Sequence, residues 1–468
     1  MPSLSPAEFA SALALVGAVI LIAALLSGLV ERSGVPQVAI FLALGGALGP
    51  AGLAALDVEL DSGALQIAAT LSLALILFTD ALSLDLREVR EHRALALLAI
   101  GPGTLVSAAL FGGAAWLLLD LSGPAAAILG AALASTDPVL LKGLLRRPDL
   151  PAAARDALRL ESGLNDVVLL PIVLVALAVL GGASIGGGTG LRLGLDLLRL
   201  GPGAGVLVGL LGLATLDLVR RRLGVRRDYE SLYSLGVAFA AYAAAESVHG
   251  SGFLAAFAAG GTIALLDVEL CDCFREYGET TAELALLLTF VLLGSSLIWT
   301  GIREASGATI LFAAFVLVAR PAIYLAALAP TRIDWPTRWL VAWFGPRGLS
   351  SLLLALLAVF AGAPDAGVIF HVASLVVLLS ILLHGSTLIW IGRRAPVAMA
   401  PELIAISEVQ ALLAAGETVQ PIDARKEADW AQSDEQARGA LRLSPDRPAA
   451  DARVHGLPPD AWLALYCT

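Results

Sequence analysis

Acidic residues interrupt several long apolar stretches of this 468-residue chain. Asp137 follows Ser135 and Thr136 in one such stretch, and Asp166 follows Asn165 in the next. An ionised side chain at the middle of a bilayer costs roughly 2.5–3.5 kcal/mol on insertion scales, so it is expected to be paired, to face a water-filled path or to bind a ligand. These carboxylates therefore predict a site for a small cation or a proton.

Residues 160–166 would carry most of this chemistry if they form a helix. Four polar side chains then fall on one face, because offsets of three and four residues bring side chains together. They are Glu161, Ser162, Asn165 and Asp166. Oxygen atoms around one carboxylate suit a hard monovalent cation, and the same carboxylate can take a proton, since burial disfavours the anion. A site that holds one or the other, never both, exchanges them by competition.

The elements that position these residues are predicted to be membrane-spanning helices. The chain is 58% hydrophobic and 15% charged, whereas a soluble protein is about a quarter charged. Apolar windows long enough to cross a bilayer of about 30 Å recur along the first 392 residues. They predict thirteen spans, at about residues 8–30, 34–55, 64–84, 94–119, 124–145, 160–181, 202–219, 231–248, 251–267, 283–299, 307–329, 338–360 and 366–391.

Two of these spans are interrupted next to a charge. Ser135-Thr136-Asp137-Pro138 breaks the span at 124–145, and Phe344-Gly345-Pro346-Arg347-Gly348 breaks the span at 338–360. A lone Pro usually marks only a kink. Interrupted spans in corresponding positions of two halves, however, point to a transporter binding site near the membrane midplane. We therefore expect inverted repeats with two crossed, discontinuous helices.

Four motifs follow one another along the chain. They are Thr136-Asp137-Pro138-Val139, Glu161-Ser162-x-x-Asn165-Asp166, Ala319-Arg320 and Gly345-Pro346-Arg347-Gly348-x-Ser350. In order and spacing they resemble the sodium/proton exchangers of the monovalent cation:proton antiporter 1 family, and the likeness covers roughly residues 8–392. The resemblance implies a secondary transporter rather than an enzyme.

The resemblance also implies roles for the residues of the first two motifs. Asp166 would bind both the cation and the proton. Ser162 and Thr136 would add oxygen ligands, Thr136 through its hydroxyl or its backbone. Asn165 and Asp137 would hold the crossing region together, with Asp137 offsetting the charge of the half-helix ends.

Three further roles follow from the same resemblance. Glu161 would pair with Arg320 and lock the core of the protein. Arg347 would stabilise the opposing helix break. In the family, Asn-Asp at positions 165 and 166 accompanies electroneutral exchange, whereas two consecutive Asp residues accompany electrogenic exchange, so electroneutral exchange is expected.

Other titratable residues in the spans leave alternatives open. Asp80, in the span at 64–84, could line the ion path or could be a charge near a helix end. His371 and His384 lie in the last predicted span. Histidine titrates near neutral pH, so they could sense pH, but packed or interfacial roles are favoured for both.

The polar segment 395–468 is predicted to be a separate cytoplasmic segment, after a transmembrane domain of residues 1–394. A capped helix from Ser407 and strand-like stretches at 419–425, 439–443 and 462–468 resemble a rhodanese-like domain. Cys467 matches the catalytic cysteine of that domain. It is followed by one residue instead of the loop of backbone amides that would hold the sulfur and its anionic cargo, so the segment is incomplete and sulfurtransferase activity is not expected.

Loop charges predict the orientation in the membrane. Nearly all Lys and Arg residues fall in loops on the C-terminal side, and the opposite loops keep only Arg192, Arg199 and Arg303. The positive-inside rule then places the N-terminus outside and the C-terminus in the cytoplasm, in a bacterial inner membrane.

We expect a homodimer that exchanges Na⁺ or Li⁺ for H⁺ without a cofactor and without binding nucleic acid. Two alternatives stay open at this point. One is a K⁺/H⁺ antiporter on the same scaffold, since oxygen ligands alone do not separate these ions. The other is a channel-like or sensor protein that is gated by its C-terminal tail.

Overall fold

The computed structural model describes most of the chain up to residue 394 and several short stretches beyond it. The described residues are 14, 16–25, 36–84, 93–145, 147, 150–182, 189–223, 227–266, 272–331, 333–394, 409, 419–425, 430, 436–444, 451–452, 454–456 and 462–466. They belong to two units, Met1–Arg394 and Ala395–Thr468.

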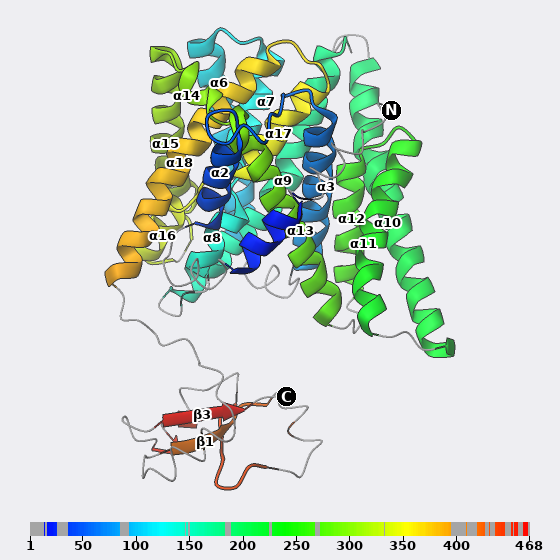
Figure 1. Cartoon of the computed structure of the whole chain (residues 1–468), viewed down its shortest axis with the longest axis vertical. Coiled ribbons are helices and arrows are strands. Elements are labelled where there is room, and N and C mark those ends of the chain that lie inside the picture. Colours follow the sequence, from blue (N-terminus) through cyan, green and yellow to red (C-terminus); the bar gives the residue numbers. More distant parts are fainter. Residues whose placement is uncertain are drawn as a thin grey trace. The chain divides into compact units, whose positions relative to one another are not determined.

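The first unit is helical (Figure 1). Its helices are α2 (Gln37–Leu48), α3 (Gly63–Leu82), α5 (Arg93–Leu98), α6 (Leu105–Leu119), α7 (Gly123–Ala134), α8 (Pro138–Leu145), α9 (Ala152–Leu180), α10 (Thr189–Leu223), α11 (Arg227–Ser247), α12 (Gly252–Leu265), α13 (Asp272–Leu292), α14 (Thr300–Arg303), α15 (Gly307–Ala327), α16 (Trp335–Trp343), α17 (Leu349–Phe360) and α18 (Ala366–Arg394), with π-helical turns η1 (Ala99–Thr104) and η3 (Leu293–Leu297). Helices suit apolar spans because a lipid environment leaves backbone groups no partner outside the segment.

The apolar helices define a polytopic membrane protein. Among the described residues, 8 helical segments are long and apolar enough to cross a bilayer, and shorter apolar helices include Val16–Leu25, α2, α12 and α17. The long segments alone do not reach thirteen, so that number of spans stays a prediction.

Several helices extend beyond the predicted spans. The span predicted at 160–181 begins at Ala152, directly after Pro151, so Arg155 and Arg159 lie on α9 rather than in a loop. Likewise α13 begins at Asp272, eleven residues before the predicted start of its span at residue 283. The difference arises because a hydropathy window ends where apolar residues end, whereas a helix continues through polar turns until its backbone is capped.

Both predicted interruptions are present. α7 ends at Ala134 and α8 begins at Pro138, where the missing N–H of proline would have lacked a helical partner anyway. α16 ends at Trp343 and α17 begins at Leu349. A Cβ atom at Gly348 would collide with the Asp137 carboxyl group, so only glycine lets the two breaks approach this closely.

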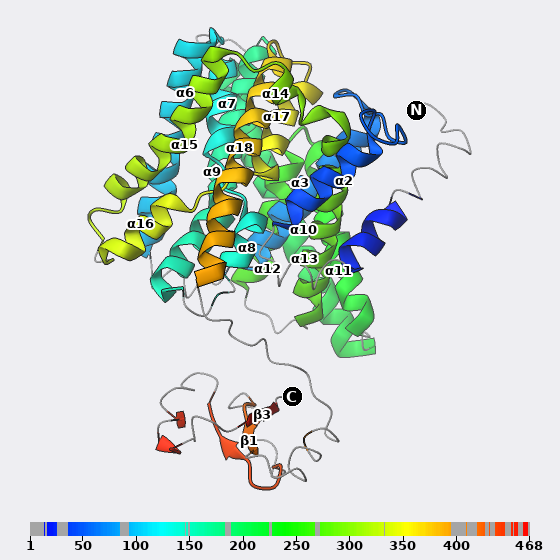
Figure 2. The same ribbon diagram turned by 60° about the vertical axis from the view of Figure 1, so that its left-hand side comes forward.

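Helix contacts separate two groups of helices (Figures 1 and 2). α6, α9, α17 and α18 pack around α7, and α15 packs on α6, α16 and α18. α10, α11 and α12, on the right of Figure 1, pack with one another, while α12 and α13 pack on α3. The groups meet where α3 contacts α9 and α17, where α9 contacts α10 and where α14 contacts α18. The interrupted helices are therefore enclosed by continuous ones.

The second unit contains a three-stranded parallel sheet of order β2-β1-β3. Its strands are β1 (Val419–Asp423), β2 (Leu441–Arg442) and β3 (Trp462–Tyr466). Next to β1, Arg425 pairs with Asp423 at 2.7 Å. Cys467 and the predicted helix that begins at Ser407 lie outside the described residues, so the likeness to a rhodanese-like domain stays a prediction.

Candidate cation and proton site

The two helix breaks face each other and are joined through Asp137. Its backbone N–H donates to Pro346 O at 2.9 Å. Its carboxylate accepts the N–H of Val139 at 2.8 Å, at the start of α8, and the N–H of Leu349 at 2.6 Å, at the start of α17. Helix N-termini carry unpaired N–H groups and a partial positive charge. One buried carboxylate therefore stabilises two half-helix N-termini.

Arg347 plays the complementary part at the end of α7. Its Nη1 donates to Ala134 O at 2.7 Å and to Ser135 O at 2.8 Å. Helix C-termini carry unpaired carbonyl groups and a partial negative charge, which a guanidinium group offsets. Each break thus supplies one charge that compensates a half-helix end of the other break.

Glu161 on α9 is buried with three hydrogen-bond donors. Its Oε2 accepts Arg320 Nη2 at 2.9 Å. Its Oε1 accepts the hydroxyl of Thr136 at 2.7 Å and that of Tyr324 at 2.8 Å. Arg320 also donates to two backbone carbonyls near the end of α16. Because charge and hydrogen bonds are satisfied together, this carboxylate is suited to hold α9, α15 and the first break in place.

Asp166, five residues further along α9, has a different environment. Its Oδ1 accepts the Ser135 hydroxyl at 2.5 Å, and Ser350 lies beside the same carboxylate. Its Oδ2 is buried and accepts no hydrogen bond from the described residues. The same holds for Oδ1 of Asn165, whose Nδ2 donates to Thr136 O at 3.4 Å. Buried acceptors are normally paired, so these two oxygens fit a cation or a proton as their partner.

Ser162 is buried on α9 beside Glu161, and its hydroxyl donates to Arg159 O at 3.4 Å. This bond leaves the lone pairs of the hydroxyl oxygen available. Asn165 thus contacts Thr136 of the first break, and Asp166 follows Asn165 on α9. The Ser162 hydroxyl instead bonds within its own helix.

Asp80 lies two residues before the end of α3 and is half-buried. It is close enough for its charge to interact with those of Asp166, Asp137 and Lys142. A carboxylate so placed can attract a cation toward the site, as the ion-path alternative requires.

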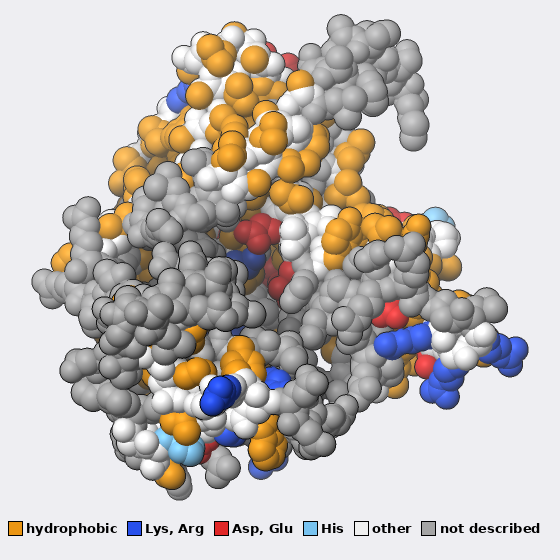
Figure 3. All heavy atoms as spheres, turned by 60° about the horizontal axis from the view of Figure 1, so that its bottom comes forward, with side chains coloured by type: hydrophobic (Ala, Val, Ile, Leu, Met, Phe, Trp, Pro, Cys, Tyr) orange, Lys and Arg blue, Asp and Glu red, His pale blue; other side chains and the backbone are white. Residues whose placement is uncertain are grey.

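The region around Asp80 links the two groups of helices. Lys142 on α8 forms an ion pair with Glu283 on α13, with Nζ and Oε2 2.7 Å apart. Ser83 donates to Glu279 Oε1 at 2.7 Å, joining the end of α3 to α13. Figure 3 shows acidic side chains inside a hollow on the face that lies at the bottom of Figure 1.

Four further polar residues support the breaks: sequence reasoning missed Tyr324 and Ser380, gave Ser135 no role of its own, and favoured a packed or interfacial role for His384. Tyr324 and Ser135 contact the two carboxylates of α9 directly. Ser380 accepts the N–H of Arg347 at 2.7 Å, and His384 bonds to Ser380 and to a carbonyl at the end of α16. A signal was present, because Tyr324 follows Arg320 by four residues and His384 follows Ser380 by four. Each pair shares a helix face.

His371 is not part of this group. His371 lines a separate pocket of about 180 Å³ together with Glu304, between α14 and α18. Cys467 is outside the described residues.

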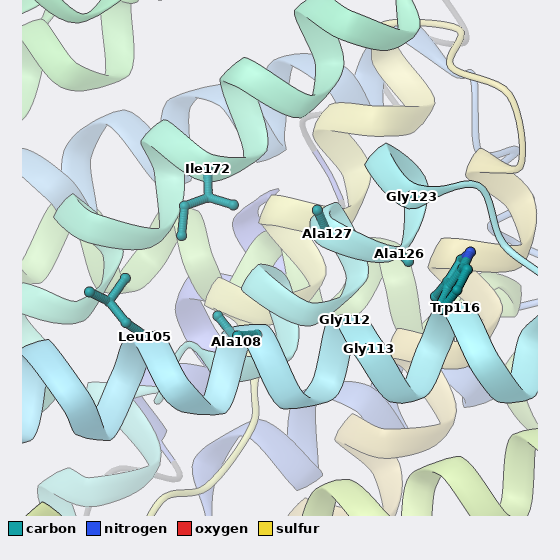
Figure 4. Close-up of a pocket in the computed structure, with 10 residues that line it drawn as sticks. Leu105, Ala108, Gly112, Gly113, Trp116, Gly123, Ala126, Ala127 and Ile172 are labelled. Carbon is teal, nitrogen blue, oxygen red and sulfur yellow. The ribbon is translucent and has the colours of Figure 1, made fainter.

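An apolar groove of about 510 Å³ lies between α6, α7 and α9 (Figure 4). Trp116, Ala126 and Ile172 are among its lining residues, and none of the lining side chains is titratable. It therefore has no group that could exchange a proton and is distinct from the Asp166 site.

Comparison with known proteins agrees with this geometry. The family described as "Sodium/hydrogen exchanger, transmembrane" matches residues 18–394. The K(+)/H(+) antiporter NhaP2 of Shewanella sp. (strain MR-4) is 29% identical over 413 residues, which cover 84% of this chain and 68% of the relative. An uncharacterized Na(+)/H(+) exchanger of Mycobacterium bovis is 30% identical over 369 residues, covering 71% of this chain and 65% of the relative.

The fold resembles that of a solved antiporter. The structure of the sodium proton antiporter MjNhaP1 from Methanocaldococcus jannaschii at pH 8 has a TM-score of 0.68 and is 21% identical in sequence. The likeness covers 83% of this chain and 99% of that one.

Because the family match covers most of its length, the chain belongs to the sodium/hydrogen exchanger family. It is an integral membrane cation/proton antiporter, and hence a secondary transporter rather than an enzyme.

Proposed function

We propose that this antiporter exchanges Na⁺, or Li⁺, for H⁺ by alternating access, with both ions competing for Asp166. The observation that carries the proposal is the pair of buried acceptors without a donor, Asp166 Oδ2 and Asn165 Oδ1, next to the crossed helix breaks. A proton on the carboxylate and a bound cation neutralise the same charge, so binding of one excludes the other.

The cation would be held by oxygen atoms from both α9 and the first break. Asp166 supplies the charge, while Asn165, Thr136 and Ser162 supply neutral oxygens. Asp137 keeps the half-helices in position. Neutral and anionic oxygen ligands suit hard monovalent cations, which must exchange their hydration water for ligands of the site.

Exchange is expected to be one for one and electroneutral. Glu161 is neutralised by Arg320, and Asp137 is engaged with two helix N-termini. Asn165 carries no charge, so Asp166 remains the single carboxylate in this cluster that is available to the transported ions. One Na⁺ or one H⁺ then leaves the loaded site with the same charge. A transport rate that changed steeply with membrane voltage would contradict this.

K⁺/H⁺ antiport is the second candidate. It is favoured by the names of relatives such as NhaP2 of Shewanella, whereas the structural neighbour is a sodium proton antiporter. Similar oxygen ligands serve both ions, so the choice depends on the size of the site when the ion is bound.

The orientation in the membrane is proposed from the loop charges. We propose that the protein lies in a bacterial inner membrane with its C-terminus in the cytoplasm, forms a homodimer, and consists of an exchanger domain at 1–394 and a cytoplasmic segment at 395–468. A channel or sensor gated by that segment would predict flux that neither saturates nor moves protons.

The test is exchange in proteoliposomes with an acidic interior and a trapped pH-sensitive dye. Na⁺, Li⁺ and K⁺ are added outside in separate titrations. We expect saturable, cation-dependent alkalinisation of the interior, with half-maximal rates at lower Na⁺ or Li⁺ than K⁺. A response to K⁺ at the lowest concentration would favour the second candidate, and no response to any of the three ions would reject antiport of these cations.

A further inference from the structure

Tyr324 connects the Glu161 cluster to a helix outside the crossing. It lies on α15, is 1% exposed, and donates its hydroxyl to Glu161 Oε1 at 2.8 Å. The same hydroxyl lies 3.2 Å from Thr104 Oγ1 in η1. One turn earlier on α15, the guanidinium carbon of Arg320 lies 4.2 Å from the centre of the Tyr324 ring. Arg320 and Tyr324 of α15 therefore donate to the same carboxylate, and the Arg320 guanidinium group packs on the Tyr324 ring.

The Tyr324 ring packs against Gly103 in the π-helical turn η1. A Cβ atom at Gly103 would come within 3.1 Å of the Tyr324 ring, so glycine allows the close approach. Thr104 can donate to Ala99 O at 3.2 Å or to the Tyr324 oxygen. Single π-helical turns inside α-helices are frequent at functional sites, because they redirect side chains that an α-helix would space differently.

The contacts with Glu161 fix where the hydroxyl protons of Tyr324 and Thr136 point. Paired with Arg320, Glu161 accepts hydrogen bonds with both oxygens, and each hydroxyl has one proton to donate. The protons of Tyr324 and Thr136 therefore both point to Glu161 Oε1. This turns the lone pairs of Thr136 away from Glu161, and Arg347 Nη1 donates to them at 3.4 Å. The Thr136 hydroxyl is therefore held between Glu161 and Arg347, and its backbone carbonyl accepts Asn165 Nδ2 at 3.4 Å. Glu161 thus sets the direction of a hydroxyl that belongs to the first break.

We infer that Tyr324 is a positioning residue of the cation site, which acts through Glu161 on the position of Thr136, whose backbone carbonyl contacts Asn165. The inference rests on the proposed function. Arg320 engages Oε2 of Glu161, and Tyr324 fixes the other oxygen, so together they hold the plane of the carboxylate. Without the Tyr324 hydroxyl, Glu161 can turn about its Arg320 contact and Thr136 loses its fixed orientation. Cation binding then weakens while the movement that carries the ion is unaffected.

The test compares Tyr324→Phe with Tyr233→Phe in proteoliposomes. Phenylalanine keeps the ring under Arg320 and against Gly103. Tyr233 on α11 is a matched control, because its hydroxyl donates to Gly212 O at 2.9 Å, within the other group of helices. For Tyr324→Phe, we expect the cation concentration at half-maximal rate to rise about three- to tenfold with little change in maximal rate, as for loss of a typical intramolecular hydrogen bond. The Tyr233 variant should match wild type.

A second variant makes the inference independent of how well Tyr324→Phe folds. Thr104→Val removes the hydroxyl next to Tyr324 and should produce a smaller shift in the same direction. The double variant should equal Tyr324→Phe alone, since Thr104 acts through Tyr324.

Two results would overturn the positioning role. One is an unchanged half-maximal concentration in both single variants, and the other is a fall in maximal rate alone. If wild type itself moved no protons on cation addition, the proposed function would fail instead, and the two failures can be told apart.

Discussion

Glu161 and Asp166 lie five residues apart on α9 and are both buried, yet their environments differ. Glu161 receives donors from Arg320, Thr136 and Tyr324, so both of its oxygens are engaged. Asp166 accepts the Ser135 hydroxyl with Oδ1 and has no arginine partner among the described residues, and its Oδ2 is unpaired among them. Burial alone therefore does not mark a transport carboxylate. The distinction lies in which carboxylate has an oxygen left to accept a proton or a cation.

Removal of the charge that neutralises Glu161 should have the largest effect on the protein. Arg320→Ala leaves an uncompensated buried carboxylate, and breaking such a pair costs about 3–5 kcal/mol. We expect a large fall in thermal stability, measured in detergent by the loss of monodisperse protein on heating.

The control for Arg320→Ala is Arg221→Ala, which removes an exposed i,i+4 pair with Asp217. Exposed helix pairs of this kind contribute about 0.3–0.5 kcal/mol, so the control should be close to wild type. Equal stability of the two variants would show that the Glu161–Arg320 pair is not structural.

A second carboxylate next to Asp166 should change the net charge that is moved in each exchange. Asn165→Asp supplies a second group that can bind a proton or a cation, so the cation-loaded and the proton-loaded sites no longer carry equal charges. We expect the exchange rate to become voltage-dependent when a K⁺ diffusion potential is imposed with valinomycin on vesicles loaded with different K⁺ concentrations. An exchange rate that stays insensitive to voltage in the variant would contradict the charge count.

The Ser135 hydroxyl donates to Asp166 Oδ1 at 2.5 Å. Ser135→Ala removes it, while Ser107→Ala serves as a control because the Ser107 hydroxyl donates to Gly103 O within its own helix. We expect Ser135→Ala to change the cation concentration at half-maximal rate by about tenfold or more, because a hydrogen bond to a charged group contributes about 1.5–3 kcal/mol. Identical titrations for the two variants would mean that Ser135 does not tune the site.

The smallest expected effect is at a similar acid–arginine pair in the second unit. Hydrogen bonds from Arg425 lower the pKa of Asp423 to about 2. A lowered pKa stabilises the sheet fully above the unfolded value of about 3.9, and this contribution is lost as the pH falls toward the folded value. We expect hydrogen-exchange protection of β1 to decline between about pH 4 and pH 2, after correction for intrinsic rates.

The matched variant for this last prediction is Asp423→Asn, which has no carboxyl group to titrate. Its protection should be lower than that of wild type at pH 5 and should change less down to pH 2. A parallel decline in wild type and variant would assign the pH dependence to other groups.

Much of the site could be predicted from the sequence because its charges stand out against apolar segments. Asp137, Glu161, Asp166 and Arg347 are conspicuous there, and prolines mark both breaks. Tyr324 could not be assigned in this way, because its partner Glu161 lies 163 residues earlier in the chain.

The faces of the helices were also hard to predict. α7 is apolar all around and almost entirely buried, so hydrophobicity does not tell which side meets α9 and which meets α6. The ends of α9 and α13 were equally hard to predict, because polar turns continue each helix beyond its apolar window. Contacts between distant helices decide these features, and no local pattern contains them.

The most direct test of the difference between the two carboxylates is cation-dependent proton movement by Asp166→Asn in proteoliposomes, with the thermal stability of the same purified sample. Asparagine keeps the shape of the side chain but can neither take a proton nor offer a charge to a cation. We predict that exchange is abolished for Na⁺, Li⁺ and K⁺ while stability stays at or above that of wild type. Exchange that persists in the variant would contradict competition at Asp166 and place the transport carboxylate elsewhere.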